Sequence, residues 1–201
     1  MNIVKAALTV GSFTLVSRVL GFVRDLMIAR VLGASAMADS FFVSFKLANL
    51  FRRLFAEGAF NAAFVPLFAR TLEGEGEDEA RRFAREALAV MSTVLLVVVL
   101  LALLCMPFVV RGLAPGFAPD GERYSLAVEL SRITFPYLML ISLAALFSGV
   151  LNSIGRFAAA AFAPIILNVV LIGALLMASR HPETPAHALA WGVFVAGILQ
   201  L

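Results

Sequence analysis

The residues best suited to bind a charged ligand are charged side chains inside an apolar stretch, Gly11 to Ile28. At helical spacing, its polar and small residues share an arc of roughly 140°, and Phe, Leu and Val side chains fill the rest. The residues of this arc are Gly11, Thr14, Ser17, Arg18, Gly21, Arg24 and Asp25. A charge at bilayer depth costs about 3 kcal/mol on insertion scales. The pattern predicts a membrane helix with one face toward lipid and the other toward water or an anion; an interfacial amphipathic helix is the alternative.

A second polar stripe follows in the segment Ala36 to Phe68. Most of its polar residues fall within an arc of roughly 80°, and one arginine lies about 60° to the side. The arc holds Asp39, Lys46, Asn49, Arg53 and Glu57, with Arg52 beside it. The opposite face is rich in phenylalanine. Two adjacent helices with matched polar stripes predict a shared polar cavity, because intramembrane charges face inward.

The amino-acid composition indicates that the helices carrying these polar stripes lie in a membrane. The chain has 201 residues, of which 62% are hydrophobic and 14% charged, and its mean hydropathy is +0.98. A soluble domain averages about 45–50% apolar and about 25% charged residues. Long apolar runs without strand-like alternation predict an all-α integral membrane protein. The single cysteine, Cys105, excludes a disulfide framework, and no metal-ligand cluster, nucleotide loop or cofactor motif is evident.

The hydrophobic runs predict about six transmembrane helices in a single membrane domain over residues 1–201. The predicted spans are 6–30, 36–68, 87–110, 126–151, 157–179 and 186–201. Charges within the first span argue against a cleaved signal peptide. Within the fifth span, Asn168 is expected to be a polar contact beside a kink at Pro164. The two histidines are expected to be interface residues rather than ligands.

Basic residues in the short loops set the predicted orientation. With the N-terminus inside, the inner segments hold Lys5, Arg70, Arg81, Arg82, Arg85 and Arg156, and the outer segments hold Arg30, Arg111, Arg123 and Arg180. The inner side therefore has the excess of basic residues. We expect the N-terminus and the aqueous stretch Glu73–Glu86 to be cytoplasmic.

Five segments resemble the bacterial lipid II flippase family, MurJ, also called MviN. They are SRVLGFVRD at Ser17–Asp25, ADSFFVSFKLANLFRRLFAEGAFNAAFVPLFA at Ala38–Ala69, LAPGF at Leu113–Phe117, ITFPYLMLISLAAL at Ile133–Leu146 and LNSIGRFAAAAFAPIILN at Leu151–Asn168. The resemblance implies the amino-terminal lobe of a fourteen-helix alternating-access exporter in the bacterial inner membrane. The carboxy-terminal lobe, which the family supplies as a partner for this one, is not expected within these residues.

The resemblance also implies a substrate and its binding residues. The family's cavity arginines correspond to Arg18, Arg24 and Arg52, and Asp39 corresponds to an acidic position associated with function. Ser17, Asp25, Asn49, Arg53 and Glu57 lie in the same motifs and are weaker candidates for the substrate-binding site. The implied substrate is lipid II, whose pyrophosphate joins an undecaprenyl chain to a disaccharide-pentapeptide. Membrane lipids are the other implied partners, and no nucleic acid or catalytic step is expected.

Three alternatives remain from the residues themselves. The resemblance places the family in a superfamily of polysaccharide and drug exporters, so a related multidrug or polysaccharide exporter is one alternative. A multidrug cation exporter would have a cavity dominated by acidic residues. A voltage sensor would carry a basic residue about every third position, whereas Arg18, Arg24 and Arg30 are spaced by six. A structural membrane subunit would use the polar stripes for packing alone.

Overall fold

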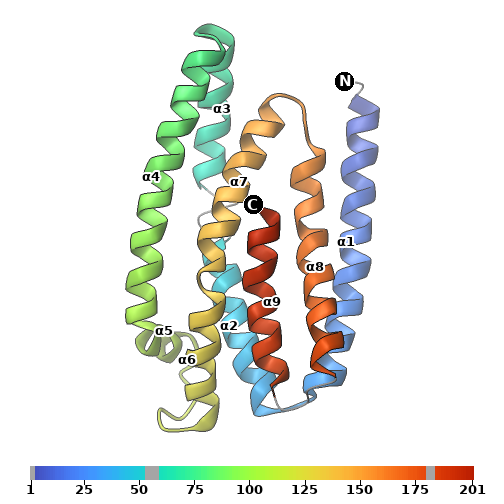
Figure 1. Cartoon of the computed structure of the whole chain (residues 1–201), viewed down its shortest axis with the longest axis vertical. Helices are drawn as coiled ribbons and strands as arrows, with labels where there is room; N and C mark the ends of the chain where they lie inside the picture. Colours follow the sequence, from blue (N-terminus) through green and yellow to red (C-terminus); the bar gives the residue numbers. More distant parts are fainter. Residues whose placement is uncertain (1–2, 53–58, 180–183) are drawn as a thin grey trace.

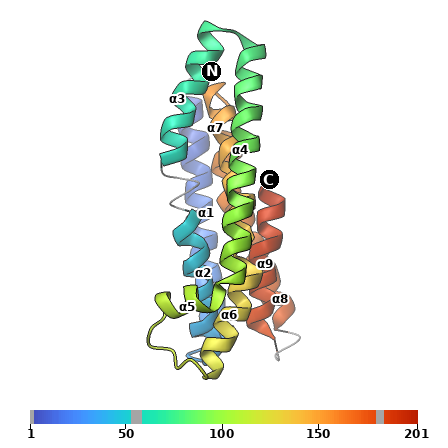
Figure 2. The same cartoon turned by 90° about the vertical axis from the view of Figure 1, so that its left-hand side faces the viewer.

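The computed structural model describes residues 3–52, 59–179 and 184–201, and these residues form nine α-helices. The helices are α1 (Ile3–Leu32), α2 (Ala36–Arg52), α3 (Ala59–Gly74), α4 (Glu77–Leu104), α5 (Met106–Leu113), α6 (Glu122–Thr134), α7 (Tyr137–Ser153), α8 (Ala158–Ala178) and α9 (Pro185–Gln200). Most of them run along the long axis of an elongated bundle (Figure 1). The short helix α5 turns away from the axis of α4 near one end of the bundle (Figure 2). The predicted all-helical fold class is confirmed for the described residues.

Three of the described helical segments are long and apolar enough to cross a membrane. They are α4, the segment Glu122–Ser153 that combines α6 and α7, and α8. The helix α9 is apolar but has 16 residues, and α2 has 17. The helix α1 has 30 residues and carries the charged polar face described above. Of the six predicted spans, three are therefore long and apolar enough to cross a membrane, and the other three are short or charged.

Several of the predicted spans have different ends in the structure. The predicted span 36–68 is described as α2 and α3, with residues 53–58 outside the described part of the chain. The predicted span 87–110 starts earlier, at Glu77, and is divided where α4 ends at Leu104. Pro107 lies in the first turn of α5 and cannot continue α4, because its nitrogen carries no hydrogen and its ring clashes with the preceding turn.

A second proline divides the predicted span 126–151. The structure has α6 and α7 there, and they meet at Phe135 and Pro136. Because Pro136 has no amide hydrogen, the carbonyl of Arg132 loses its helical partner. The last two predicted spans, 157–179 and 186–201, agree with α8 and α9 to within one residue. Between α7 and α8 the chain turns at Gly155, whose φ of 76° favours glycine.

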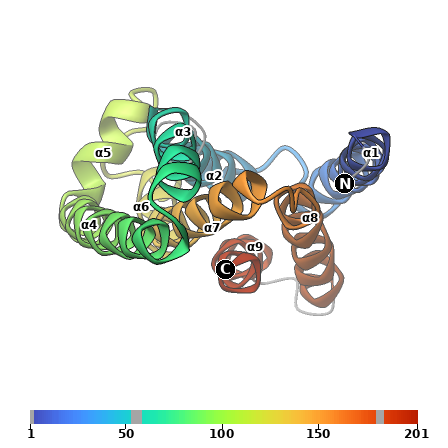
Figure 3. The same ribbon diagram turned by 90° about the horizontal axis from the view of Figure 1, so that it is seen from above.

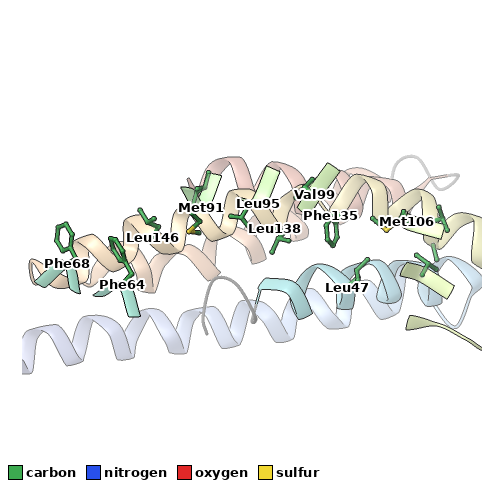
Figure 4. Packing of buried hydrophobic residues seen from close by; sticks show 14 of the residues in the cluster. Leu47, Phe64, Phe68, Met91, Leu95, Val99, Met106, Phe135, Leu138 and Leu146 are labelled. Atoms are coloured by element: carbon green, nitrogen blue, oxygen red, sulfur yellow. The ribbon is translucent and has the colours of Figure 1, made fainter. Parts of the chain in front are cut away.

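Buried side chains form two clusters. In the first, α4 packs on α7 and α3 through side chains such as Leu95, Leu138 and Phe64 (Figure 4). In the second, α2, α8 and α9 meet around Phe41 and Leu171. Lipid tails are as apolar as leucine, so such contacts in a bilayer stabilise the fold chiefly through close packing.

The helix α1 lies at one edge of the bundle. Its main neighbour is α8, and it contacts α2 and α9 less. Viewed down the long axis of the bundle, α1 and α8 lie on the opposite side from α4 and α5 (Figure 3). The helix α8 is therefore well placed to contribute to a site built on the α1 arginines.

Candidate functional site

Arg24 is the most closely held of the predicted site residues. Its Nη1 donates a hydrogen bond to Oδ1 of Asn168 at 2.7 Å. Its Nε and Nη2 both donate to Oδ1 of Asp25, at 3.0 and 2.7 Å. The guanidinium carbon lies 5.7 Å from the ring centroid of Phe45 on α2, within the range of a cation–π contact. These contacts stabilise a cation whose side chain is only 15% exposed, whereas the Asp25 side chain is 63% exposed.

Asn168 connects this arginine to the rest of the polar face. It lies in the apolar helix α8 and is 5% exposed. Its Nδ2 donates to the backbone oxygen of Ser17 at 2.9 Å and to the Ser17 hydroxyl at 3.3 Å. The sequence indicated a polar contact at Asn168 but did not place it in the site. A lone amide within an apolar span was the available signal, because a buried amide needs hydrogen-bond partners.

A hollow of about 430 Å³ lies among α2, α3, α7, α8 and α9. Its polar lining residues are Asn49, Arg52, Tyr137, Ser148, Asn152 and Gln200. Within this set, Nε of Arg52 donates to Oδ1 of Asn49 at 3.3 Å, and Nδ2 of Asn49 donates to the Phe45 carbonyl at 3.0 Å. The structure thus brings Arg52 and Asn49 together at one hollow.

A second hollow, of about 390 Å³, lies among α1, α7 and α8 and is lined by Ser17 and Arg18. Asn152, Ala160 and Pro164 line both hollows, which are therefore adjacent. Pro164 also leaves the Ala160 carbonyl without its helical amide partner. The Arg18 side chain is exposed and has no hydrogen-bond or ion-pair partner within the described residues. Two arginines, Arg18 and Arg52, thus line adjacent hollows that share one wall.

The remaining predicted site residues have other positions. Asp39 is not among the residues lining either hollow; its Oδ2 lies 3.3 Å from Nη1 of Arg123 on α6. Arg53 and Glu57 lie outside the described residues. No group of three or more potential metal-ligating side chains occurs within the described ranges 3–52, 59–179 and 184–201.

The electrostatics of the described site favour an anion. Among the described residues, those that line the two hollows include arginines but no acidic side chain. Asp25 partly balances the neighbouring Arg24 at the site, and its own side chain remains mostly exposed. An arginine guanidinium has five N–H donors in a planar fork that matches phosphate oxygens. The arrangement can therefore bind a phosphate-bearing ligand without a metal ligand set or a nucleophile.

Comparisons with known proteins agree on one family. The family model described as "Lipid II flippase MurJ" matches residues 28–201. A relative from Rhizobium tropici named "Probable lipid II flippase MurJ" is 52% identical over 205 residues, which cover 100% of this chain and 38% of the relative. The "Lipid II flippase MurJ" of Burkholderia cenocepacia is 44% identical over 200 residues, with 100% and 39% covered.

A solved structure described as "Lipid II flippase MurJ, inward closed conformation" is similar in fold. The TM-score is 0.78 at 26% sequence identity, over 94% of this chain and 40% of that chain. This chain spans about two fifths of the length of the curated relatives that it matches. The relatives align over its full length, including the α1 arginines that precede the family-model match. On these matches, the chain belongs to the lipid II flippase MurJ family.

Proposed function

We propose that this chain is the amino-terminal portion of a transporter that moves lipid II from the inner to the outer leaflet of the bacterial inner membrane. The observation that carries the proposal is that two arginines line adjacent hollows and a third lies on the same helix as one of them. Arg18 and Arg52 line the hollows, and Arg24 lies on the same helix as Arg18 with its guanidinium held between α1 and α8. A second portion of the protein would complete the cavity, and transport would proceed by alternating access.

The chemistry of the substrate fits these side chains. Lipid II carries a pyrophosphate between its prenyl chain and its sugars, and this anion must leave water to cross the bilayer. Arginine remains charged and donates paired hydrogen bonds to phosphate oxygens. When substrate is absent, Asp25 limits the cost of the Arg24 charge, since an unpaired buried charge is strongly unfavourable. Moving the lipid breaks no covalent bond, so the proposed activity is transport and not catalysis.

Ser17 and Asn49 have supporting roles in this proposal. Ser17 lines one hollow and accepts the hydrogen bonds of Asn168, and Asn49 lines the other hollow beside Arg52. Arg53 and Glu57 are retained as candidates from their place in the family motif. Asp39, in the first turn of α2, is proposed to act through its ion pair with Arg123 and not by contacting the anion.

The competing cation exporter is less well supported. A cavity that binds organic cations needs carboxylates facing it. Among the described residues, the lining of both hollows has arginines and neutral polar side chains in their place. The anion-binding proposal therefore explains the charges that are present.

We further propose that the N-terminus is cytoplasmic. The start of α1 and the turn between α3 and α4 lie at the same end of the bundle (Figure 1). The basic residues of the first turns of α4 would then lie on the inner side, as the positive-inside rule favours. The opposite end, with α5 and the start of α6, would face the periplasm.

The proposal is tested in the full-length protein of which this chain is a part. Arg18→Ala, Arg24→Ala and Arg52→Ala should each abolish or sharply impair growth of a flippase-depleted cell that depends on the variant. Arg111→Ala is the control, because Arg111 is exposed on α5, a helix with no residue in the lining of either hollow. Immunoblots of the membrane fraction establish that each variant inserts at normal levels. Full complementation by all three alanine variants at normal levels would contradict the proposal.

A further inference from the structure

We infer that Asn168 is a positioning residue for Arg24, which holds the arginine so that its remaining N–H groups can bind a phosphate. The inference rests on the proposed function, since it concerns the same anion site. It assigns a role on α8, a helix that the charge pattern of the sequence did not associate with anion binding.

The donor count of Arg24 supports this role. A guanidinium has five N–H groups, one on Nε and two on each of Nη1 and Nη2. Asn168 accepts one hydrogen bond from Nη1, and Asp25 accepts one each from Nε and Nη2. One N–H on each of Nη1 and Nη2 therefore has no partner within the described part of the chain. Bidentate phosphate binding uses one N–H from each of two guanidinium nitrogens.

The orientation of the Asn168 amide is fixed by α1. Its Nδ2 faces the backbone carbonyl oxygen of Ser17, which can only accept a hydrogen bond. The Oδ1 must then face the opposite way, where Nη1 of Arg24 lies at 2.7 Å. Ser17 and Arg24 are about two helical turns apart on one face of α1. The Asn168 side chain from α8 thus connects two residues of the α1 polar face, Ser17 and Arg24.

Burial makes this connection specific. Asn168 is 5% exposed in a helix that otherwise has apolar side chains at its centre. A buried amide is unfavourable unless both of its ends are hydrogen-bonded. Within residues 3–52, 59–179 and 184–201, the side-chain hydrogen bonds of Asn168 all go to α1, two to Ser17 and one to Arg24. The competing explanation is that Asn168 only holds α8 against α1.

The same helix pair offers a control for that explanation. The rings of Phe13 on α1 and Phe162 on α8 meet edge to face, with centroids 5.7 Å apart. Phe162→Leu loosens the contact between α1 and α8 without touching Arg24 or either hollow. A purely structural role for Asn168 predicts that Phe162→Leu and Asn168→Leu have similar effects on ligand binding.

The experiment measures binding of farnesyl pyrophosphate to the purified full-length protein in nanodiscs, with uncharged farnesol as the reference ligand. Asn168→Leu, which is close in size and cannot accept a hydrogen bond, should weaken pyrophosphate binding roughly tenfold and leave farnesol binding unchanged. Phe162→Leu should leave both affinities unchanged. Asn168→Ser is a second variant and should also weaken pyrophosphate binding. Its hydroxyl can bond to its own helix and is too short to reach Arg24.

A double-mutant cycle separates positioning from packing. If Asn168 acts through Arg24, adding Asn168→Leu to Arg24→Ala should cause no further loss of affinity. If the two losses multiply, Asn168 acts independently of Arg24 and the inference is overturned. If Arg24→Ala weakens binding but neither Asn168 variant does, the inference fails and the proposed function stands. If Arg24→Ala itself leaves pyrophosphate affinity unchanged, the proposed anion site fails and the inference fails with it.

Discussion

Asp39 and Arg123 form an ion pair that joins the first turn of α2 to the first turn of α6, with Oδ2 and Nη1 3.3 Å apart. The next residue, Ser40, donates from its hydroxyl to the Arg123 backbone carbonyl at 2.9 Å. These helix ends lie at the opposite end of the bundle from the start of α1 (Figure 1). Asp39 therefore links two helices at the proposed periplasmic end and does not contact the arginines of the hollows.

The Asp39–Arg123 pair should contribute little to stability, because both side chains are about half exposed. Exposed pairs typically contribute about 0.2–1 kcal/mol. In a double-mutant cycle with Asp39→Ala and Arg123→Ala, we expect a coupling energy in that range from denaturant unfolding of the full-length protein. If Asp39→Ala nevertheless impairs complementation, Arg123→Ala should impair it as well. A functional defect in one variant alone would contradict a shared role for the pair.

Helical periodicity was a sound guide to the polar face of α1. It placed Ser17 and Arg24 on one side of a helix, and the structure brings both to Asn168. It could not identify Asn168 as their partner, because the two segments are far apart in the sequence and periodicity describes one helix at a time. The partner of Asp39 was unpredictable for the same reason.

The helix ends were predicted where composition changes and mispredicted where a proline divides an apolar run. Both ends of α8 and the start of α9 coincide with polar stretches of the sequence, which the composition reveals. Pro107 and Pro136 lie inside hydrophobic stretches, where membrane helices also tolerate proline. The hydrophobic signal continued across both prolines, so α5 and the division between α6 and α7 were not anticipated.

Close packing of α9 makes Gly197 sensitive to substitution. A Cβ atom there would lie 2.8 Å from Cδ2 of Tyr137 and 3.1 Å from Cβ of Leu140, both on α7. Overpacking of this kind typically costs about 1–3 kcal/mol. Gly197→Ala should therefore lower the apparent Tm of the full-length protein.

Gly173 is the matched control for this substitution. It lies inside α8, and a Cβ there would meet nothing within 4 Å. Since alanine favours a helix over glycine by about 1 kcal/mol, Gly173→Ala should leave the Tm unchanged or raise it. Equal losses of stability in Gly173→Ala and Gly197→Ala would contradict the packing argument.

The proposed orientation predicts the labelling pattern of single cysteines. The native Cys105 is exposed and is first replaced by serine. With the N-terminus cytoplasmic, cysteines at Ala34 and Asp120 should react with an impermeant maleimide added to intact spheroplasts. A cysteine at Glu77 should react only after the membrane is permeabilised. Labelling of Glu77 in intact spheroplasts, with Ala34 and Asp120 protected, would reverse the orientation.

Lysine at Arg24 should be a poor replacement, although it conserves the charge. The guanidinium simultaneously bonds Asn168 and Asp25, and its central carbon lies 5.7 Å from the ring centroid of Phe45. An ammonium group has three donors and no planar fork, so bonding both neighbours leaves one N–H for a phosphate in place of two. A charge-assisted hydrogen bond contributes about 1.5–3 kcal/mol, which corresponds to roughly ten- to a hundredfold in affinity. We therefore expect Arg24→Lys to bind farnesyl pyrophosphate at least about tenfold more weakly than the wild type and to complement only partially.

Lys46→Arg is the reciprocal control, since Lys46 is exposed on α2 and lines neither hollow, and it should be silent in both assays. Wild-type affinity in Arg24→Lys would mean that charge alone recruits the anion and that the fork held by Asn168 is dispensable.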